Sequence, residues 1–320
     1  MAQQEEVRAS WLVSGPYYLS SHRCATCEHG AESDNHVNIK QLVKQTRVGR
    51  AVLLPYRLSL ATRYLLRDIA LVPTWLIRSR EIGNFTYQVT ELFRETLSCV
   101  IAEISNVDIT AVRSYVMEFD HDDILKNHVR EARVGDPRSA ISDYEVRPGK
   151  RLIYYVLTRT MKPRLVVEAG VDKGLGSCII SAALMRNAEE GFPGRLLACD
   201  ISSDAGHLLS GVYRSVGELV PCGIEDLPDR LTGPIDLYFH DITPGAESAA
   251  LQALGAHFAP GAMVVSPWHT GAMLRFSQRM NWSFRILPEQ TTGTWYRGSQ
   301  IVVVSGARPD RTVEGADQGR

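Results

Sequence analysis

The stretch VVEAGVDKGLGS, residues 166–177, joins an apolar run to a loop with three glycines. Glycine-rich loops that follow a strand hold several kinds of ligand, and the spacing discriminates between them. A phosphate-binding P-loop needs a lysine after its last glycine, whereas Lys173 precedes Gly174. A dinucleotide fingerprint needs glycines in the order GxGxxG, whereas they fall here at 170, 174 and 176. The loop therefore fits neither a nucleoside triphosphate nor a dinucleotide.

Glu168 at the end of the apolar run adds an electrostatic argument. Its carboxylate would repel a pyrophosphate seated on the following helix N-terminus, so we expect a ligand with positive charge near this point. S-adenosyl-L-methionine carries an ammonium and a sulfonium but no phosphate. Its carboxylate can accept N–H bonds from the loop. A purely structural turn, in which the glycines only permit close packing, is the competing interpretation.

The rest of the C-terminal half alternates between strand-like and helix-like patterns. Short apolar runs occur at 164–170, 196–201, 235–241 and 262–268, with helical stretches at 177–190 and 246–258 between them. This alternation predicts a parallel sheet covered on both faces. Two further runs, 283–290 and 299–306, have no crossover helix between them and predict an antiparallel edge hairpin. We expect an α/β, Rossmann-like doubly wound fold.

The N-terminal part has a different character. Apolar residues at three and four spacing predict helices at about 57–72, 87–104, 109–119 and 122–134, with Asp108 and either Asp120 or Asp122 as N-caps. A Gly- and Pro-rich connection follows at 135–149. We therefore expect an N-terminal extension at 1–149, a ligand-binding domain at 150–305 and a disordered tail at 306–320. The extension could act as a lid over the site or as a surface for a homodimer.

Composition narrows the class of partner. The 320 residues have a net charge of −1, and 44% of them are hydrophobic. No apolar run is long enough for a membrane span, no broad basic field suits a nucleic acid, and the opening residues lack a secretory signal. We expect a cytoplasmic protein with a small-molecule substrate.

The cysteines give no firm metal site. Cys24 and Cys27 have the spacing of a zinc half-site, with His22 and His29 beside them, but no second half follows. We therefore predict no metal.

In an open parallel sheet, ligands lie outside the carboxyl ends of the strands. Asp200, which ends one run, is placed to accept the hydroxyls of a ribose, with Ile201 beside it. Glu225 or Asp226 is a candidate for the adenine end, with Ile224 packing on the ring and a helix N-cap as the alternative. Arg151, Tyr154 and Tyr155 precede the first run and could reach the methionine end of the cofactor or cover its sulfonium, although ordinary helix packing competes with that interpretation.

Four segments in order, VVEAGVDKGLGS, GRLLACDI, GPIDLYFHDI and PGAMVVSPW, resemble the motifs of class I S-adenosylmethionine-dependent methyltransferases. The resemblance covers about residues 150–305 and implies a seven-stranded sheet with an antiparallel edge strand. It also implies that Glu168, Gly170 and Gly174, with Gly176 nearby, form the cofactor loop and that Asp200 is the ribose-binding acid. Small-molecule O-methyltransferases are the most similar branch. The metal-using members have an acidic pair where this chain has SPWH, so a magnesium site is not expected.

Three functions remain open from the sequence. The first is methyl transfer, with Asp241 as the best-placed base and His269 and Tyr155 as further catalytic candidates. The second is a lyase reaction, in which the cofactor's own amine closes a ring to give azetidine-2-carboxylate and methylthioadenosine. Some synthases of that product resemble class I methyltransferases. The third is a binding protein that keeps the fold without catalysis.

Overall fold

The computed structural model describes residues 51, 53–78, 87–132, 134, 136, 145–147, 149–242, 247–292 and 300–306. Cys24, Cys27 and the tail from 307 onward lie outside the described residues. Contacts divide the chain into two units, 1–60 and 61–320, and helix α3 (Leu54–Arg78) spans the division. No helix in the described ranges has the length and apolar character of a membrane span.

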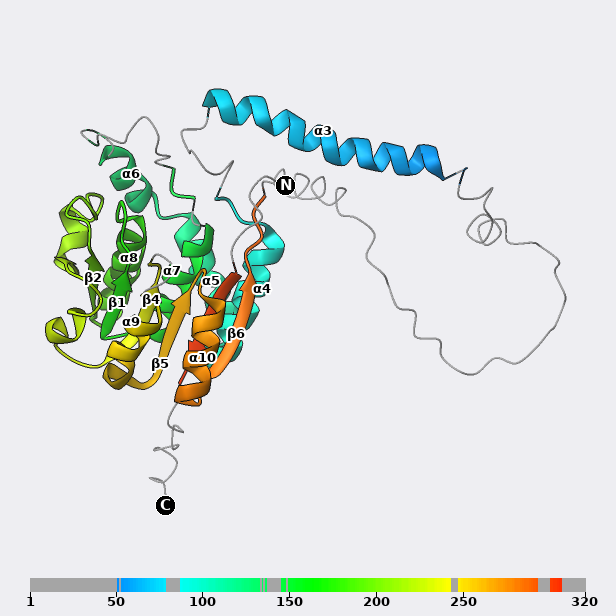
Figure 1. The fold of residues 1–320 in the computed structure, drawn as a ribbon. Helices are drawn as coiled ribbons and strands as arrows, with labels where there is room; N and C mark the ends of the chain where they lie inside the picture. The colour runs from blue at the N-terminus through cyan, green and yellow to red at the C-terminus, as the bar shows by residue number, and fades with distance from the viewer. Residues whose placement is uncertain are drawn as a thin grey trace, which may run out of the picture. The chain divides into compact units, whose positions relative to one another are not determined.

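The second unit contains a seven-stranded sheet with the order β3-β2-β1-β4-β5-β7-β6 (Figure 1). The strands are β1 (Leu165–Ala169), β2 (Arg195–Asp200), β3 (Gly217–Pro221), β4 (Ile235–His240), β5 (Phe258–Ser266), β6 (Ser283–Pro288) and β7 (Gln300–Ser305). The first five run parallel, and β7 pairs antiparallel with both β5 and β6. The predicted α/β sheet with an antiparallel C-terminal edge is confirmed.

Two strands differ from the sequence prediction. Strand β3 was not predicted, because its five residues are mostly half-buried or exposed and give no continuous apolar run. A short 3-10 helix, η3 (Gly211–Ser215), connects β2 to β3 in place of an α-helix. Strand β5 begins four residues earlier than expected. Its register with β4 shifts between Ile235 and Leu237, and this β-bulge lies in the part of β5 that the sequence pattern did not predict.

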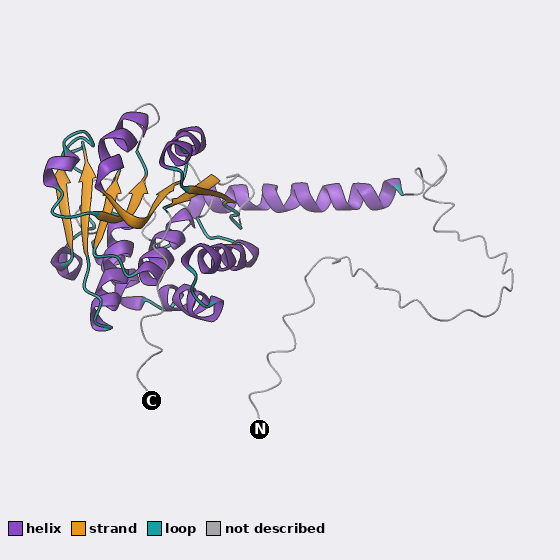
Figure 2. Ribbon diagram, turned by 90° about the horizontal axis from the view of Figure 1, so that it is seen from below, coloured by secondary structure: helices purple, strands orange, loops and turns teal. Residues whose placement is uncertain are grey.

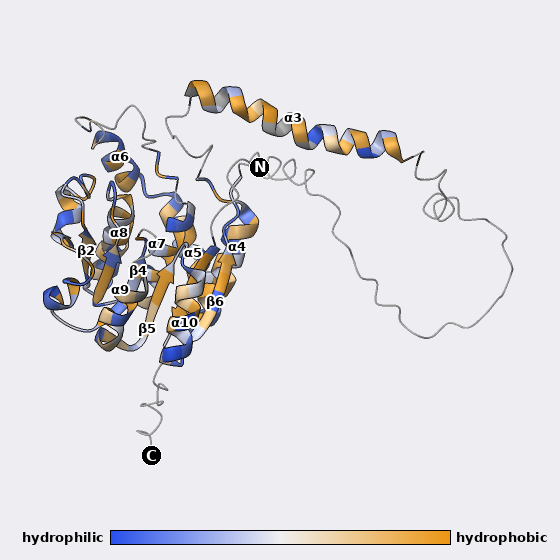
Figure 3. Cartoon of the chain, in the orientation of Figure 1, coloured by the Kyte–Doolittle hydropathy of each residue, from blue (hydrophilic) through white to orange (hydrophobic). Residues whose placement is uncertain are grey.

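Helices cover both faces of the sheet (Figure 2). Helices α7 (Leu152–Met161) and α8 (Leu175–Glu189) belong to one face, and α9 (Glu247–Leu254) and α10 (Thr270–Met280) to the other. Strand side chains alternate between the two cores, so Val166 packs in the first and Val167 in the second. Glu168 has the parity of Val166 and is therefore buried on the face that α7 and α8 cover. The strands are hydrophobic along much of their length (Figure 3), as expected for a sheet buried on both sides.

Helices α4 (Glu91–Ser105), α5 (Ile109–Asp120) and α6 (Asp123–Glu131) share the core of α7 and α8. Asp108 and Asp122 accept N–H bonds from Thr110 and Leu125, which confirms both as N-caps and leaves Asp120 inside α5. Helix α4 starts four residues later than predicted, because residues 88–90 pair with 290–292 through backbone hydrogen bonds. These helices add to the domain's hydrophobic core.

Candidate active site

A cavity of about 590 Å³ lies at the carboxyl edge of β1, β2 and β4, a size typical of small-molecule sites. Its lining combines acids with apolar side chains and contains one arginine. The lining residues are Arg151, Glu168, Gly170, Val171, Asp172, Cys199, Asp200, Ile201, Cys222, Ile224, Glu225, Asp241 and Ile242. The structure therefore brings together most of the cofactor-binding residues that the sequence predicted.

The glycines of the 166–177 loop let three strand ends meet. Gly170 donates its N–H to the Cys199 carbonyl at 3.0 Å, and Asp241 donates to the Ala169 carbonyl at 2.8 Å. Gly170 has φ +87°, and a Cβ there would collide with the backbone carbonyl of Asp241. Gly174 has φ +94°, and its Cβ would lie 3.0 Å from the Cα of Gly206. Both positions need glycine for backbone packing whether or not a ligand is bound.

Glu168 is the most perturbed acid of the site. It is 2% exposed and accepts a hydrogen bond from the Ser177 hydroxyl. Burial raises the pKa of its carboxyl to about 8, although the Ser177 bond and the Arg151 guanidinium act in the opposite direction. Gly176 leaves room for this acid, because a Cβ at 176 would collide with Oε1 of Glu168. A buried carboxyl held close to neutrality is a good partner for a cation, which would restore its charge.

Asp200 shapes the loop as well as lining the cavity. Its Oδ2 accepts N–H bonds from Val171 at 2.8 Å and Asp172 at 3.1 Å, and its Oδ1 accepts one from Ser202 at 2.9 Å. Each carboxylate oxygen can accept two bonds, so Oδ1 retains capacity for a ligand hydroxyl. The neighbouring Ile201 is 87% exposed, which leaves an apolar surface for a ligand to cover.

The adenine side of the cavity is less distinctive. Ile224 is 8% exposed and lines the cavity from the segment after β3. Glu225 is exposed and folds back over Gly223, where a Cβ would collide with its carboxylate. Glu225 therefore lies at the rim of the cavity.

Asp241 is paired with a lysine that the sequence prediction did not include. The ammonium of Lys150 lies 2.9 Å from Oδ1 and 2.8 Å from Oδ2 of Asp241. Burial lowers the pKa of Lys150, while the Asp241 charge opposes this shift. The same ammonium lies 4.9 Å from the ring centroid of Trp268, which is 48% exposed. Lys150, Asp241 and Trp268 form a second group of side chains beside the acid-lined part of the cavity.

Arg151 lines the cavity as predicted. Burial lowers the pKa of its guanidinium, but the charges of Asp241, Tyr154 and Glu168 outweigh burial and raise it. The hydroxyl of Tyr154 is buried and has no hydrogen-bond partner among the described residues, while its ring stacks on Phe239 at 4.1 Å. Tyr154 is not among the residues that line the cavity, so this unsatisfied hydroxyl lies behind the lining.

Tyr155 does not reach this site. Its hydroxyl donates to Oε1 of Glu118 at 2.6 Å, in a network with Arg159 on the α5 side of α7. Adjacent helical residues point in directions about 100° apart. The structure thus places Tyr155 toward α5. Burial raises the pKa of Tyr154, and the charges of Asp241 and Glu168 add to this shift. The two successive tyrosines of RLIYY give no sign of which one faces the ligand.

His269 lies behind the Asp241 loop. It is 6% exposed, and its Nε2 lies 2.9 Å from the Ile242 carbonyl oxygen, to which it donates in the corresponding tautomer. Its ring also contacts His240, whose Nδ1 lies 2.7 Å from the Tyr238 hydroxyl. The geometry makes His269 a support for the loop. Within the described ranges, no group of three or more His, Cys, Asp or Glu side chains has the arrangement of a metal site.

The comparison with protein families decides the class. Residues 167–266 match the model of a family described as a methyltransferase domain. Residues 167–266 belong to a methyltransferase domain. The match covers all the strand ends of the cavity from Glu168 to Asp241. It confirms the class that the four motifs predicted, an S-adenosylmethionine-dependent transferase.

No curated protein matches the chain. Several solved structures are similar to it. Cofactor-bound Rv0187 from MTB has 20% identity and a TM-score of 0.43, with 59% of this chain and 92% of that chain covered. An O-methyltransferase from Bacillus cereus in complex with SAH has 16% identity and a TM-score of 0.43, with 66% and 99% covered. The O-methyltransferase TomG from Streptomyces achromogenes, involved in tomaymycin synthesis, has 21% identity and a TM-score of 0.41, with 58% and 91% covered. At these sequence identities and TM-scores, the similarities do not indicate which reaction this chain catalyses.

Proposed function

We propose that the protein transfers a methyl group from S-adenosylmethionine to an oxygen of a small molecule, without a metal ion. The observation that carries this proposal is the carboxyl-edge cavity with Glu168 beneath its loop. Five acids line a space of about 590 Å³, and one of them is buried with a pKa of about 8. Such a cavity favours a cationic ligand over a phosphate.

The residues fit the cofactor as follows. Glu168 would hold its ammonium, and Arg151 would lie near its carboxylate. Asp200 would accept ribose hydroxyls through Oδ1, while Ile201 and Ile224 supply apolar contacts for the adenine. When bound, the cofactor supplies a methyl group already activated by a sulfonium. The protein then has mainly to orient the acceptor and exclude water.

Two features support a small acceptor and a reaction without a metal. A cavity of about 590 Å³ that also holds the cofactor suits a compact acceptor. The Lys150 ammonium holds both oxygens of Asp241, the acid that would otherwise be available to bind a cation. The chain thus provides its own cation at this strand end.

The test is incubation of the protein with S-adenosylmethionine, alone and with a panel of phenols and carboxylic acids, followed by mass spectrometry. We expect S-adenosylhomocysteine, formed only when an acceptor is present. Methylthioadenosine with azetidine-2-carboxylate, formed without an acceptor, would replace the methyltransferase proposal with the lyase. Failure of the cofactor to bind would contradict both enzyme functions.

A further inference from the structure

The candidate bases at the carboxyl edge are already engaged. Asp241 accepts a hydrogen bond from Lys150 at Oδ1 and forms an ion pair with it, His269 contacts the Ile242 carbonyl through Nε2, and Tyr155 donates to Glu118. A carboxylate bound by an ammonium is a poor acceptor for another proton, because protonation would remove the ion pair. The arrangement suits an acceptor that needs no proton removed at the moment of transfer.

Lys150 is placed to attract such an acceptor. An ammonium has three N–H donors, and among the described residues Lys150 donates one hydrogen bond to Oδ1 of Asp241, with Oδ2 at 2.8 Å in the same ion pair. The side chain is 14% exposed, so the ammonium is shielded from bulk water but still reachable. Arg151 lines the adjoining wall and adds a second positive charge. A shielded ammonium binds an anion more strongly than one fully in water.

Trp268 adds a flat surface to the same place. Its ring is 48% exposed and lies 4.9 Å from Nζ of Lys150. An exposed indole face beside a cation favours a planar ligand, because stacking and the charge can act on the same molecule. The acids Glu168 and Asp200 end the neighbouring strands β1 and β2 and serve the cofactor in the proposed function.

We propose that Lys150, held by Asp241 and flanked by Trp268, binds the acceptor through an oxygen that is already ionised, a carboxylate or an acidic phenol on a planar frame. This inference rests on the proposed function. A lone pair of the ionised oxygen forms the new C–O bond as the S–CH₃ bond breaks, and the electron pair of that bond remains on sulfur. No proton is transferred in this step. Lys150 keeps its protons and neutralises the oxygen until the methyl group is attached.

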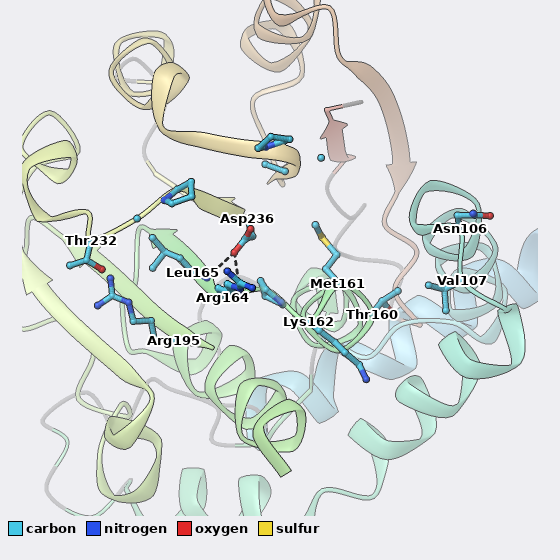
Figure 4. A pocket seen from close by; sticks show the side chains of 16 residues that line it. Asn106, Val107, Thr160, Met161, Lys162, Arg164, Leu165, Arg195, Thr232 and Asp236 are labelled. Atoms are coloured by element: carbon cyan, nitrogen blue, oxygen red, sulfur yellow. Dashed lines mark hydrogen bonds between the residues drawn. The ribbon is translucent and has the colours of Figure 1, made fainter. Parts of the chain in front are cut away.

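Lys162 provides a matched control at the other end of the sheet. Its Nζ lies 2.9 Å from Oε2 of Glu190 and 3.9 Å from the ring centroid of Phe192. It therefore has the same kinds of partner as Lys150, a carboxylate and an aromatic ring. It differs in lining the cavity at the amino ends of the strands (Figure 4).

The test uses the full chain saturated with S-adenosylhomocysteine and two planar probes of equal size, benzoate and benzamide. Their dissociation constants are measured by NMR titration on the wild type, Lys150→Met, Lys150→Arg and Lys162→Met. We expect the wild type to bind benzoate at least about five-fold more tightly than benzamide. Lys150→Met should reduce this ratio to about one, whereas Lys150→Arg and Lys162→Met should retain it.

Equal affinity of the wild type for the two probes would overturn the inference, as would an unchanged ratio in Lys150→Met. If Lys150→Met does not fold, reductive ¹³C-methylation of the wild type gives a second readout. The Lys150 signal should then move with benzoate and not with benzamide, and the Lys162 signal should move with neither. Failure of the wild type to bind S-adenosylhomocysteine would overturn the proposed function itself. Binding of the cofactor without preference for benzoate would overturn this inference alone.

Discussion

The sheet carries a cavity at each end, and the larger of the two lies at the amino ends of the strands. The amino-edge cavity measures about 970 Å³, against about 590 Å³ at the carboxyl edge. The labelled Lys162, Arg164 and Arg195 side chains point in different directions there (Figure 4). Asp236 at this edge accepts backbone N–H bonds from Arg164 at 2.8 Å and Leu165 at 2.9 Å.

The carboxyl edge differs in the state of its polar groups. Glu168 is buried with a raised pKa, and the Tyr154 hydroxyl is buried without a described partner. Groups in these states cost free energy in the ligand-free protein, and a suitable ligand can recover it. Volume therefore does not identify the site. The better criterion is a set of polar groups that lie close together and lack full hydrogen-bond or charge partners in the ligand-free protein.

The largest expected effect concerns backbone packing at the carboxyl edge. Gly170 and Gly191 both have φ +87°, but only a Cβ at 170 meets the backbone, whereas one at 191 meets nothing within 4 Å. Gly191→Ala should cost about 1 kcal/mol of unfolding free energy through backbone strain. Gly170→Ala should cost at least about 3 kcal/mol more, because Asp241 must move. Urea denaturation measures both, and equal losses would show that the strand ends are not packed as described.

The next effect is the dependence of stability on pH through Glu168. Its pKa is about 8 in the folded protein against an ordinary value of 4.5, so between these values the folded state binds the extra proton. Stability must then fall as pH rises from about 5 to about 8. Glu168→Gln removes this titration, so its stability relative to the wild type should rise over that window by on the order of a few kcal/mol.

Thermal denaturation at pH 5 and at pH 8.5 checks this prediction. A stability difference between the wild type and Glu168→Gln that stays constant with pH would mean that the carboxyl is solvated or already paired with a cation.

Asp200 and Asp236 provide a comparison across the two ends. Both accept backbone N–H bonds, three for Asp200 and two for Asp236. Asp200→Ala should weaken cofactor binding by roughly 1.5 to 3 kcal/mol, since it removes charge-assisted hydrogen bonds. Asp236→Ala should lower stability without changing that affinity. Calorimetric titration with S-adenosylhomocysteine distinguishes them, and equal losses of affinity would contradict the assignment of the cavity.

The smallest expected effect separates the two tyrosines of α7. Tyr155→Phe should lose roughly 1 kcal/mol of stability, because it removes the bond to Glu118. Tyr154→Phe should leave the stability of the ligand-free protein equal or slightly higher, because it removes an unsatisfied buried hydroxyl. Thermal shift measurements suffice, and a larger loss in Tyr154→Phe would show that its hydroxyl has a partner in the free protein.

The sequence predicted the parts of the fold that depend on local pattern. Apolar runs located β1, β2 and β4, and capping chemistry located the starts of α5 and α6. Strand β3 was missed because its five residues form no continuous apolar run. Its pairing with β2, which is a tertiary contact, defines it as a strand.

The residues of the candidate site were likewise predictable only where a local sequence pattern places them. Glu168, Asp200 and Asp241 were predictable because they end apolar runs, which places them at one edge of a parallel sheet. The pairing of Lys150 with Asp241 spans 91 positions and depends on the turn at Gly149, which has φ +51°. The choice between Tyr154 and Tyr155 depends on the rotation of α7, which the sequence does not determine to within one residue. Tertiary contacts decide both.

The most direct test of the account is calorimetric binding of S-adenosylhomocysteine at pH 7 in two buffers with different ionisation enthalpies. If the ligand's ammonium binds beside Glu168, whose pKa is about 8 in the free protein, the carboxyl must lose its proton on binding. We predict the release of roughly half to one proton by the wild type and of none through this site by Glu168→Gln. Binding with the same proton release in both proteins, or no binding by the wild type, would contradict the claim that this carboxyl-edge cavity holds the cationic end of the cofactor.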